Sequence, residues 1–452
     1  MDRRSARARR TGTATLVVAT GLAMAACGSA SGSSDAGDSF ASTTPTELSG
    51  TVSFWHFFSD READVIQSVV DDFMAANPKV KVEVHSGQDD EKLRKNISTG
   101  STIDLALSYS TDIVGNFCST GAFRDLGAVV KRDGVDLSQL TDTVKSYTEF
   151  NGTRCSMPLL ADVYGLYYNK GLLAAAGYTA PPTTLTELES MATALTTFNA
   201  DGSIKTLGFN PTMGWYENTP AHYGPAAGTA WLNADGTSAI GSSSAWTELI
   251  TWQTQFVQSL GWDKLNAFTA GLGQEFSADN AFQTGQVAMN LDGEYRTAFI
   301  ADQTPDLSYG TAPFPVADGH TDLYGGGYIT GNIAGISKGS KNPELAWALL
   351  KYLSTDTGAV VKLSNGLKNV PTTHAALTSS DLEVSPQFKT FLDIAENPKL
   401  TTTPPSPLGA GYQQSFQDWW NTYQASPSGD LGPALKDVDT QIDDALQLVS
   451  AP

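Results

Sequence analysis

The chain has 452 residues, a formal net charge of −20 and three cysteines. Such an acidic chain repels phosphate backbones and anionic lipid headgroups, which argues against nucleic acid and membrane surfaces as direct partners. About 400 folded residues exceed what one hydrophobic core usually serves, so two lobes are expected.

The first 26 residues are organised like a secretion signal. Residues 3–10 carry five arginines, and residues 13–26 are almost wholly apolar or small. The apolar run is shorter than the roughly 20 residues of a membrane-spanning helix, and it ends in a small pair, Ala25-Ala26, that a signal peptidase accepts. Residues 1–26 are therefore predicted to be removed on export.

The sequence LAMAAC at residues 22–27 resembles a bacterial lipobox. The resemblance implies that Cys27 is acylated and becomes the mature N-terminus; the alternative is an ordinary secretion signal cut beside an uninvolved cysteine. Ser, Gly, Thr, Asp and Pro dominate residues 28–49, a composition that does not fold alone. We expect residues 27–49 to be a flexible tether at the extracytoplasmic face of the cell membrane, with the lipid as the only membrane contact.

With Cys27 acylated, Cys118 and Cys155 remain. Two cysteines in an exported chain most simply pair with each other, because the outside is oxidising. Closing this loop would stabilise the fold by roughly 4 kcal/mol in the loop-entropy model. The alternative is two buried thiols, and the chain has no CxxC metal or redox motif.

The folded part begins with a predicted β-α-β unit. Residues 51–55 and 80–84 have the composition and alternation of β-strands. Between them, apolar residues repeat at helical spacing from a Ser59-Asp60 cap to an Asn77-Pro78 stop. We expect a parallel sheet with crossover helices to continue through a helix at 90–99, a strand at 103–108, helices near 111–119 and 138–148, and a crossing strand at 157–169.

Residues 170–285 indicate a second unit, with helices expected near 184–198, 244–259 and 277–284. Two Asn-Ala-Asp-Gly turns lack the further carboxylates of a calcium loop. Strands are then expected at 287–293 and 329–337, followed by an amphipathic helix at 342–354 with Pro343 in its first turn.

Five segments, taken together and in this order, are informative about the family: TVSFWHFFSD (51–60), PLLADVYGLYYNKGLLAAAGY (158–178), GQVAMNLDGEY (285–295), GGGYITGNIAGISKGSKNPELAWALLKYLS (325–354) and NGLKNVPTT (365–373). Together they resemble the type 2 extracellular solute-binding proteins of bacterial ABC importers, above all the carbohydrate-binding branch. The resemblance implies an α/β, two-lobed type 2 periplasmic-binding-protein fold, in which each lobe is a mixed sheet flanked by helices and the ligand cleft lies between the lobes. The implied division is 50–160 plus 288–338 for the N-terminal lobe and 161–287 plus 339–452 for the C-terminal lobe.

The resemblance also implies a function. The chain would be a monomeric receptor without enzymatic activity, cofactor or metal. It would close about a hinge on a mono- or oligosaccharide and deliver it to the permease subunits of an ABC importer.

A sugar has apolar C–H faces and a rim of hydroxyls, so its receptor needs aromatic platforms and planar polar side chains near the carboxyl ends of strands. Trp55 and His56 end the first strand, where the family places ligand contacts; their alternative role is packing under a loop. Asp112 follows the third strand. Asp60 and the run at 88–90 are explained at least as well by helix starts.

The segment 210–231 is dense in aromatics, Gly and Pro but has no period, which is more typical of a binding loop than of core. Trp215 and Trp231 are therefore the favoured sugar platforms. Family positions further imply ligand contacts for Tyr164, Asp292 and Tyr295. Tyr328 is the last candidate, because the glycines at 325–327 before it allow close backbone approach to a ligand; the alternative is that they simply make a tight turn.

Enzyme and metal motifs are scarce. The five histidines show no HxH or HExxH spacing, and neither GxxxxGK[ST] nor GxSxG occurs. An anchored glycoside hydrolase needs two facing carboxyl groups, and Asp112, Asp162, Asp292 and Glu294 could converge in one cleft. A polyamine, peptide or metal-chelate cargo is the other alternative; a wholly acidic cleft would favour a cation, whereas the non-periodic Trp and Tyr residues favour sugar.

Overall fold

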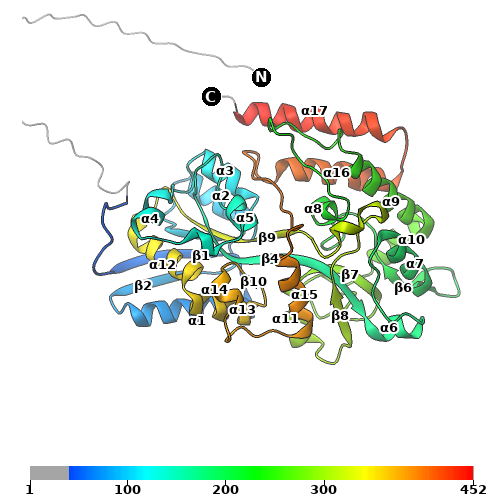
Figure 1. The fold of residues 1–452 in the computed structure, drawn as a ribbon, viewed down its shortest axis with the longest axis horizontal. Helices are drawn as coiled ribbons and strands as arrows, with labels where there is room; N and C mark the ends of the chain where they lie inside the picture. Colours follow the sequence, from blue (N-terminus) through cyan, green and yellow to red (C-terminus); the bar gives the residue numbers. More distant parts are fainter. Residues whose placement is uncertain (1–39, 451–452) are drawn as a thin grey trace, which may run out of the picture. The chain divides into compact units, whose positions relative to one another are not determined.

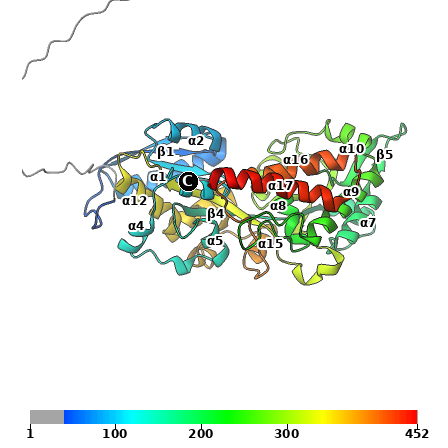
Figure 2. The ribbon, with the colours of Figure 1, turned by 90° about the horizontal axis from the view of Figure 1, so that it is seen from above.

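The computed structural model describes residues 40–450, which fall within one compact unit. The predicted signal sequence, Cys27 and the first part of the tether lie outside the described residues. Figures 1 and 2 show a central sheet with helices packed around it. Within residues 40–450, every helix is too short or too polar to cross a bilayer.

The described chain forms a ten-stranded mixed sheet. Its strands are β1 (Gly50–His56), β2 (Val80–His85), β3 (Leu105–Ser108), β4 (Met157–Asn169), β5 (Thr197–Phe198), β6 (Ile204–Phe209), β7 (Val287–Gly293), β8 (Tyr309–Ala312), β9 (Ile329–Ile336) and β10 (Val370–Pro371). The order is β2-β1-β3-β9-β4-β7-β6-β5, and β8 and β10 also pair with β4. β1 is parallel to β2 and β3, whereas β4 is antiparallel to β7, β8, β9 and β10. The long strand β4 thus joins the two ends of the sheet.

Helices surround this sheet (Figure 1). They are α1 (Asp60–Ala76), α2 (Asp90–Ser98), α3 (Ile113–Ser119), α4 (Gly127–Arg132), α5 (Asp142–Tyr147), α6 (Lys170–Ala175), α7 (Leu185–Leu195), α8 (Pro220–Tyr223), α9 (Ser244–Leu260), α10 (Trp262–Thr269), α11 (Arg296–Gln303), α12 (Pro343–Thr355), α13 (Thr357–Leu367), α14 (His374–Leu377), α15 (Pro386–Ala395), α16 (Gly411–Ala425) and α17 (Leu431–Ser450).

The β-α-β unit at the start of the chain forms as predicted. α1 buries Ile66, Val69, Val70 and Phe73, the residues whose helical spacing marked it. β1 and β2 pair in parallel with Trp55 opposite His85.

The predicted helix at 277–284 is wrong, because this segment forms turns. The side chain of Asn280 accepts hydrogen bonds from the backbone N–H groups of Phe282 and Gln283. A local side-chain acceptor of this kind competes with helical hydrogen bonds. The turns lead directly into β7.

Two large hydrophobic clusters lie at the two ends of the sheet. One contains Val52 and Phe54 of β1 together with Trp347 of α12 and Val360 of α13. The other contains residues of β6, β7, α7, α9 and α16. α12 and α13 fall in the range that was expected in the C-terminal lobe, but they bury their apolar faces against the strands of the N-terminal one. The division into two lobes otherwise stays a prediction.

Cys118, in α3, and Cys155, just before β4, form a disulfide with an S–S distance of 2.02 Å. Cys155 is fully buried. The bond therefore ties α3 to the segment that enters the central strand.

The last residues of the expected tether are bound to the folded body. The backbone N–H of Ala41 donates to Glu344 Oε1 at 2.6 Å, and its carbonyl accepts from Arg132 Nη1 at 2.9 Å. Thr44 donates to Asp133, and Phe40 and Leu48 pack against the cluster around β1. Residues 40–49 therefore differ from the predicted free tether, because polar and apolar partners on α4 and α12 hold them.

Candidate ligand-binding site

A cavity of about 770 Å³ is lined by residues from both ends of the sheet. β1 and β3 run parallel, so their carboxyl ends meet at one edge, where open α/β sheets bind ligands. The loop after β1 contributes residues 57–62, including the first turn of α1, and the loop after β3 contributes Tyr109, Ser110 and Asp112. These two loops form one wall of the cavity.

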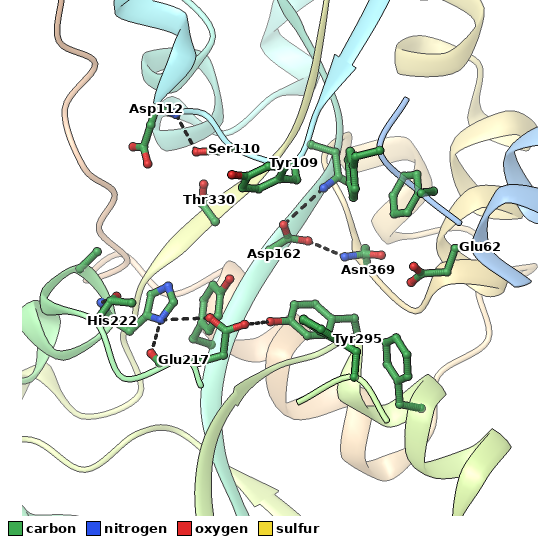
Figure 3. A pocket seen from close by; sticks show the side chains of 18 of the residues that line it. Glu62, Tyr109, Ser110, Asp112, Asp162, Glu217, His222, Tyr295, Thr330 and Asn369 are labelled. Atoms are coloured by element: carbon green, nitrogen blue, oxygen red, sulfur yellow. Dashed lines mark hydrogen bonds and ion pairs between the residues drawn. The ribbon is translucent and has the colours of Figure 1, made fainter. Parts of the chain in front are cut away.

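The central strands supply the floor. Asp162 and Tyr164 come from β4, and Thr330 and Asn332 come from β9. Asn369 donates to Asp162 Oδ1, and Asn332 donates to Asp162 Oδ2 at 3.3 Å (Figure 3). Both oxygens of this buried carboxyl group are thereby held in place.

The opposite wall comes from the loop after β6 and the segment after β7. The hydroxyl of Tyr295 donates to Glu217, and the Nδ1 atom of His222 lies 2.5 Å from the carbonyl oxygen of Glu217 (Figure 3). The ring of Tyr164 stacks on His222 with 3.7 Å between centroids. Phe276, which is 53% exposed, adds an aromatic face from the segment before β7.

The cavity changes the acid–base properties of the side chains that line it. Burial raises the pKa of Glu62, Asp112 and Glu217. Burial, with a further contribution from the charge of Glu217, raises the pKa of Asp162 to about 7. Burial lowers the pKa of His222 to about 4, so this ring is neutral at physiological pH.

Three carboxylates beside the cavity come close enough to ligate a metal ion. Glu217, Glu275 and Asp292 bring one oxygen each within 4.8 Å of the others. The buried Arg296, however, donates from Nε to Asp292 Oδ2 at 2.7 Å, and its Nη2 lies 3.8 Å from Glu275. Because this guanidinium already supplies the positive charge, we assign no metal here, and the expected absence of metal and cofactor stays a prediction.

Four of the nine predicted ligand residues line the cavity: Asp112, Tyr164, Tyr295 and Tyr328. Asp112 accepts a hydrogen bond from Gln413 of α16 at 2.6 Å, so it joins two distant parts of the chain. The Tyr328 hydroxyl shares a hydrogen bond with Thr403. Asp60, which was weighed as a weaker candidate, also lines it, as does Ser110 beside Asp112.

The other strand-end candidates lie elsewhere. His56 is fully buried between Phe54 and Phe58, and the partly buried Trp55 packs on His85 of β2, so neither side chain lines the cavity. Asp292 is fully buried behind the cavity, where it pairs with Arg296. At β1 and β7, the side chains that follow the strand, rather than Trp55, His56 and Asp292 within it, reach the cavity.

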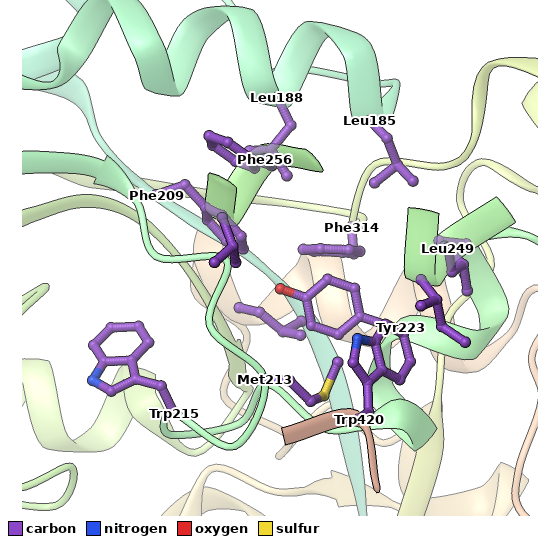
Figure 4. Packing of buried hydrophobic residues seen from close by; sticks show 14 of the residues in the cluster. Leu185, Leu188, Phe209, Met213, Trp215, Tyr223, Leu249, Phe256, Phe314 and Trp420 are labelled. Carbon is purple, nitrogen blue, oxygen red and sulfur yellow. The ribbon is translucent and has the colours of Figure 1, made fainter. Parts of the chain in front are cut away.

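The two favoured tryptophans are also buried outside the cavity. Trp231 packs edge-to-face against Trp246 and Phe416 in the cluster around β6 and β7. Trp215 belongs to the same cluster (Figure 4). Its ring stacks on that of Tyr216. The 210–231 segment does reach the cavity, but through Glu217, Thr219, Ala221 and His222.

The aromatic residues that are exposed in the cavity, chiefly Tyr109 and Phe276, were not predicted from the sequence. Glu62 and Glu217 were not predicted either. Tyr109 directly follows β3, so the strand-end rule that selected Asp112 could have found it. Phe276 directly precedes the segment 277–284 that was predicted as helix, and no strand end or family position marks it.

Comparison with known proteins identifies the family. The model of the bacterial extracellular solute-binding protein family matches residues 59–360, more than half of the chain. A binding protein of Brucella abortus (strain 2308) is 24% identical over 302 residues, which cover 66% of this chain and 70% of the relative. The maltotriose-binding protein of Pyrococcus abyssi (strain GE5 / Orsay) is 22% identical over 375 residues, covering 80% of this chain and 75% of the relative.

The fold is similar to that of CpMnBP1 solved with mannotriose bound, with a TM-score of 0.77 and 24% identity over 87% of this chain and 99% of the other. This similarity shows the maltose-binding-protein-like type 2 fold that the ordered segments implied. The chain belongs to the bacterial extracellular solute-binding protein family.

Proposed function

We propose that this protein is the saccharide receptor of an ABC importer. The observation that carries the proposal is the cavity, in which half-exposed aromatic faces stand beside hydrogen-bonding side chains. Tyr109 is 52% exposed at one wall and Phe276 is 53% exposed at the other. The maltotriose-binding protein of Pyrococcus abyssi and the structure of CpMnBP1 with mannotriose support the same class of cargo.

The cavity offers what a pyranose needs. The flat rings of Tyr109 and Phe276 can cover apolar C–H faces, and carboxylates and amides can bind the hydroxyl rim. Gln413, Gln414 and Gln417 of α16 line the same cavity as Asp112 and Thr330. The ligand therefore meets polar groups from both ends of the sheet.

A ligand that contacts both ends favours the conformation in which those ends are closest, because only that conformation gives it every contact. We infer that two lobes close on the saccharide and that the closed form is the one delivered to the membrane permease. Acylation of Cys27 would keep the receptor at the extracytoplasmic face of the membrane.

Binding without turnover is favoured over hydrolysis. The matched family consists of binding proteins. Of the four carboxylates considered for a glycosidase, Asp292 and Glu294 are fully buried behind the cavity. Asp162, which does line it, already accepts from two asparagines.

The test is calorimetric titration with a panel of mono- and oligosaccharides, followed by variants. Tyr109→Ala and Phe276→Ala should each weaken binding of the best saccharide about tenfold, or about 1.4 kcal/mol, because each removes a stacking face. Phe198→Ala is the matched control, since Phe198 is 51% exposed but lies outside this cavity. Unchanged affinity in both cavity variants would contradict the proposed site.

A further inference from the structure

The charges that line the cavity are strongly unbalanced. Arg61 is the one cationic side chain among the described residues that line it, and lysine is absent from that set. Six carboxylates share the lining: Asp60, Glu62, Asp112, Asp162, Glu217 and Asp302. A ligand in this cavity therefore experiences a negative potential.

Arg61 offsets only part of this potential, because it is a single cation among six acidic groups. It donates from Nη1 to the carbonyl oxygen of Gly366 at 2.5 Å, and its Nη2, 3.8 Å from Glu62, has no hydrogen-bond partner among the described residues. The lining therefore keeps an excess of acidic groups.

His222 adds an acceptor instead of a charge. A carbonyl oxygen only accepts, so the Nδ1 atom of His222 must donate to the Glu217 carbonyl, which leaves Nε2 without a proton in the neutral ring. The side chain is 8% exposed, and within the described chain the structure gives Nε2 no hydrogen-bond partner. Figure 3 shows His222 at the cavity wall below Asp112. This acceptor is open to a hydrogen-bond donor from the ligand.

The carboxylates also repel one another. The charges of Glu217 and Glu62 both contribute to the raised pKa of Asp162. Asp162 and Glu217 have hydrogen-bond donors from the protein, but the structure gives Glu62 none among residues 40–450 and only the 3.8 Å contact with Arg61. A neutral polyol would supply hydrogen bonds to this set, whereas an ammonium group supplies three donors and the missing positive charge.

We propose that the saccharide carries a protonated amino group, and that Glu62, Asp162 and Glu217 surround this group in the cavity. The inference rests on the proposed function, because the aromatic faces and the neutral amides call for a sugar ring as well as a charge. A linear polyamine would leave the faces of Tyr109 and Phe276 without a flat partner.

The test uses sugars in matched sets. Glucose, mannose, galactose and their β-1,4-linked disaccharides are each compared by calorimetry with the corresponding 2-amino-2-deoxy and N-acetyl forms, at neutral pH, because a lower pH would protonate Asp162, whose pKa is raised to about 7. The N-acetyl form retains the nitrogen but removes the charge. The amino form of at least one sugar should bind tenfold or more tightly than both of its neutral partners, and added salt should reduce this difference.

Two variants locate the charge. Glu62→Gln and Glu217→Gln should each weaken binding of the amino sugar about tenfold while changing binding of a neutral sugar less than about twofold, since each removes charge at constant shape. Asp64→Asn is the control, because Asp64 is an exposed acid of the same helix that lies outside the cavity. Melting temperatures confirm that each variant folds. If one of the two cavity variants does not fold, the other alone tests the proposal.

The outcomes separate the two proposals. Tighter binding of a neutral sugar, or equal losses of affinity for neutral and amino sugars in the variants, would contradict the proposed amino group. The proposed saccharide receptor would be unaffected by either result. If spermidine binds and no saccharide does, the proposal of a saccharide ligand is contradicted. If none of the probes binds, both proposals are contradicted.

Discussion

Trp231 shows how strongly a single residue can be committed to the core. It contacts Trp246, Tyr412 and Phe416 edge-to-face, and it is 7% exposed. Its position near the cavity in sequence, within the 210–231 segment, says little about where its ring points. Ring orientation is decided by α9 and α16, which are far away in the chain.

Trp231→Ala should therefore act on stability. We expect it to lower the free energy of unfolding by about 3–5 kcal/mol, because it leaves a large void among aromatic rings. Urea unfolding monitored by circular dichroism measures this, with Phe198→Ala as an exposed aromatic control. A fully stable variant that fails to bind saccharide would show instead that Trp231 serves the ligand.

The residues that the sequence did predict share a simple geometry. Asp112 follows β3, and Tyr164, Tyr295 and Tyr328 lie in or beside strands of the sheet's centre. Strand ends and family positions are readable along the chain. Neither signal identifies Glu62 or Glu217, because their place in the cavity depends on how the two ends of the sheet face each other.

At the scale of elements, alternation and helical spacing located β1, β2, α1, α9 and α12 to within a few residues. Short elements were missed, such as α4 and the two-residue strands β5 and β10, because so few residues carry no period. The segment at 40–49 was also misjudged. Its composition is that of a tether, but the partners that hold it, Arg132 and Glu344, lie far along the chain.

Arg132→Ala should release this segment. Arg132 Nη1 bridges the Ala41 carbonyl and Glu344, and charge-assisted hydrogen bonds are worth about 1.5–3 kcal/mol each. We expect amide hydrogen exchange in residues 40–49 to accelerate by tenfold or more. Lys131→Ala, which removes an exposed neighbouring cation, should leave the exchange unchanged; equal acceleration in both variants would contradict this role.

For the whole molecule, the order of five distant segments was enough to identify the fold, since that order reflects the path of the chain through the sheet. The division of the chain into two lobes stays a prediction. α12 and α13 return to the cluster around β1 after the chain has crossed the sheet, and only their packing partners reveal it.

Buried acids also set a pH dependence for the whole fold. Burial raises the pKa of Asp90 and Asp162 to about 7, so the folded state binds more protons than the unfolded state between the ordinary carboxyl pKa and that value. Stability must then fall as pH rises through this range, by about 1.4 kcal/mol per pH unit for each such group. His56 and His222, whose pKa values are lowered to about 4, act in the opposite sense below their unfolded pKa of about 6.5.

We therefore expect the melting temperature to fall from about pH 6.5 to about pH 8, where the acids act without opposition from these histidines. Asp90→Asn should flatten this fall, because an amide mimics the protonated acid and can still accept from Ser108. Calorimetric scans across this range measure both effects, and a melting temperature that rises with pH would contradict them.

All nine tryptophans lie within the described residues, and none of them lines the cavity. Intrinsic tryptophan fluorescence cannot then be quenched by a ligand that touches an indole directly. A change in emission on adding sugar would come from indoles that shift against their protein neighbours. Tryptophan emission, which is often used to measure ligand occupancy, would for this protein report conformational change instead.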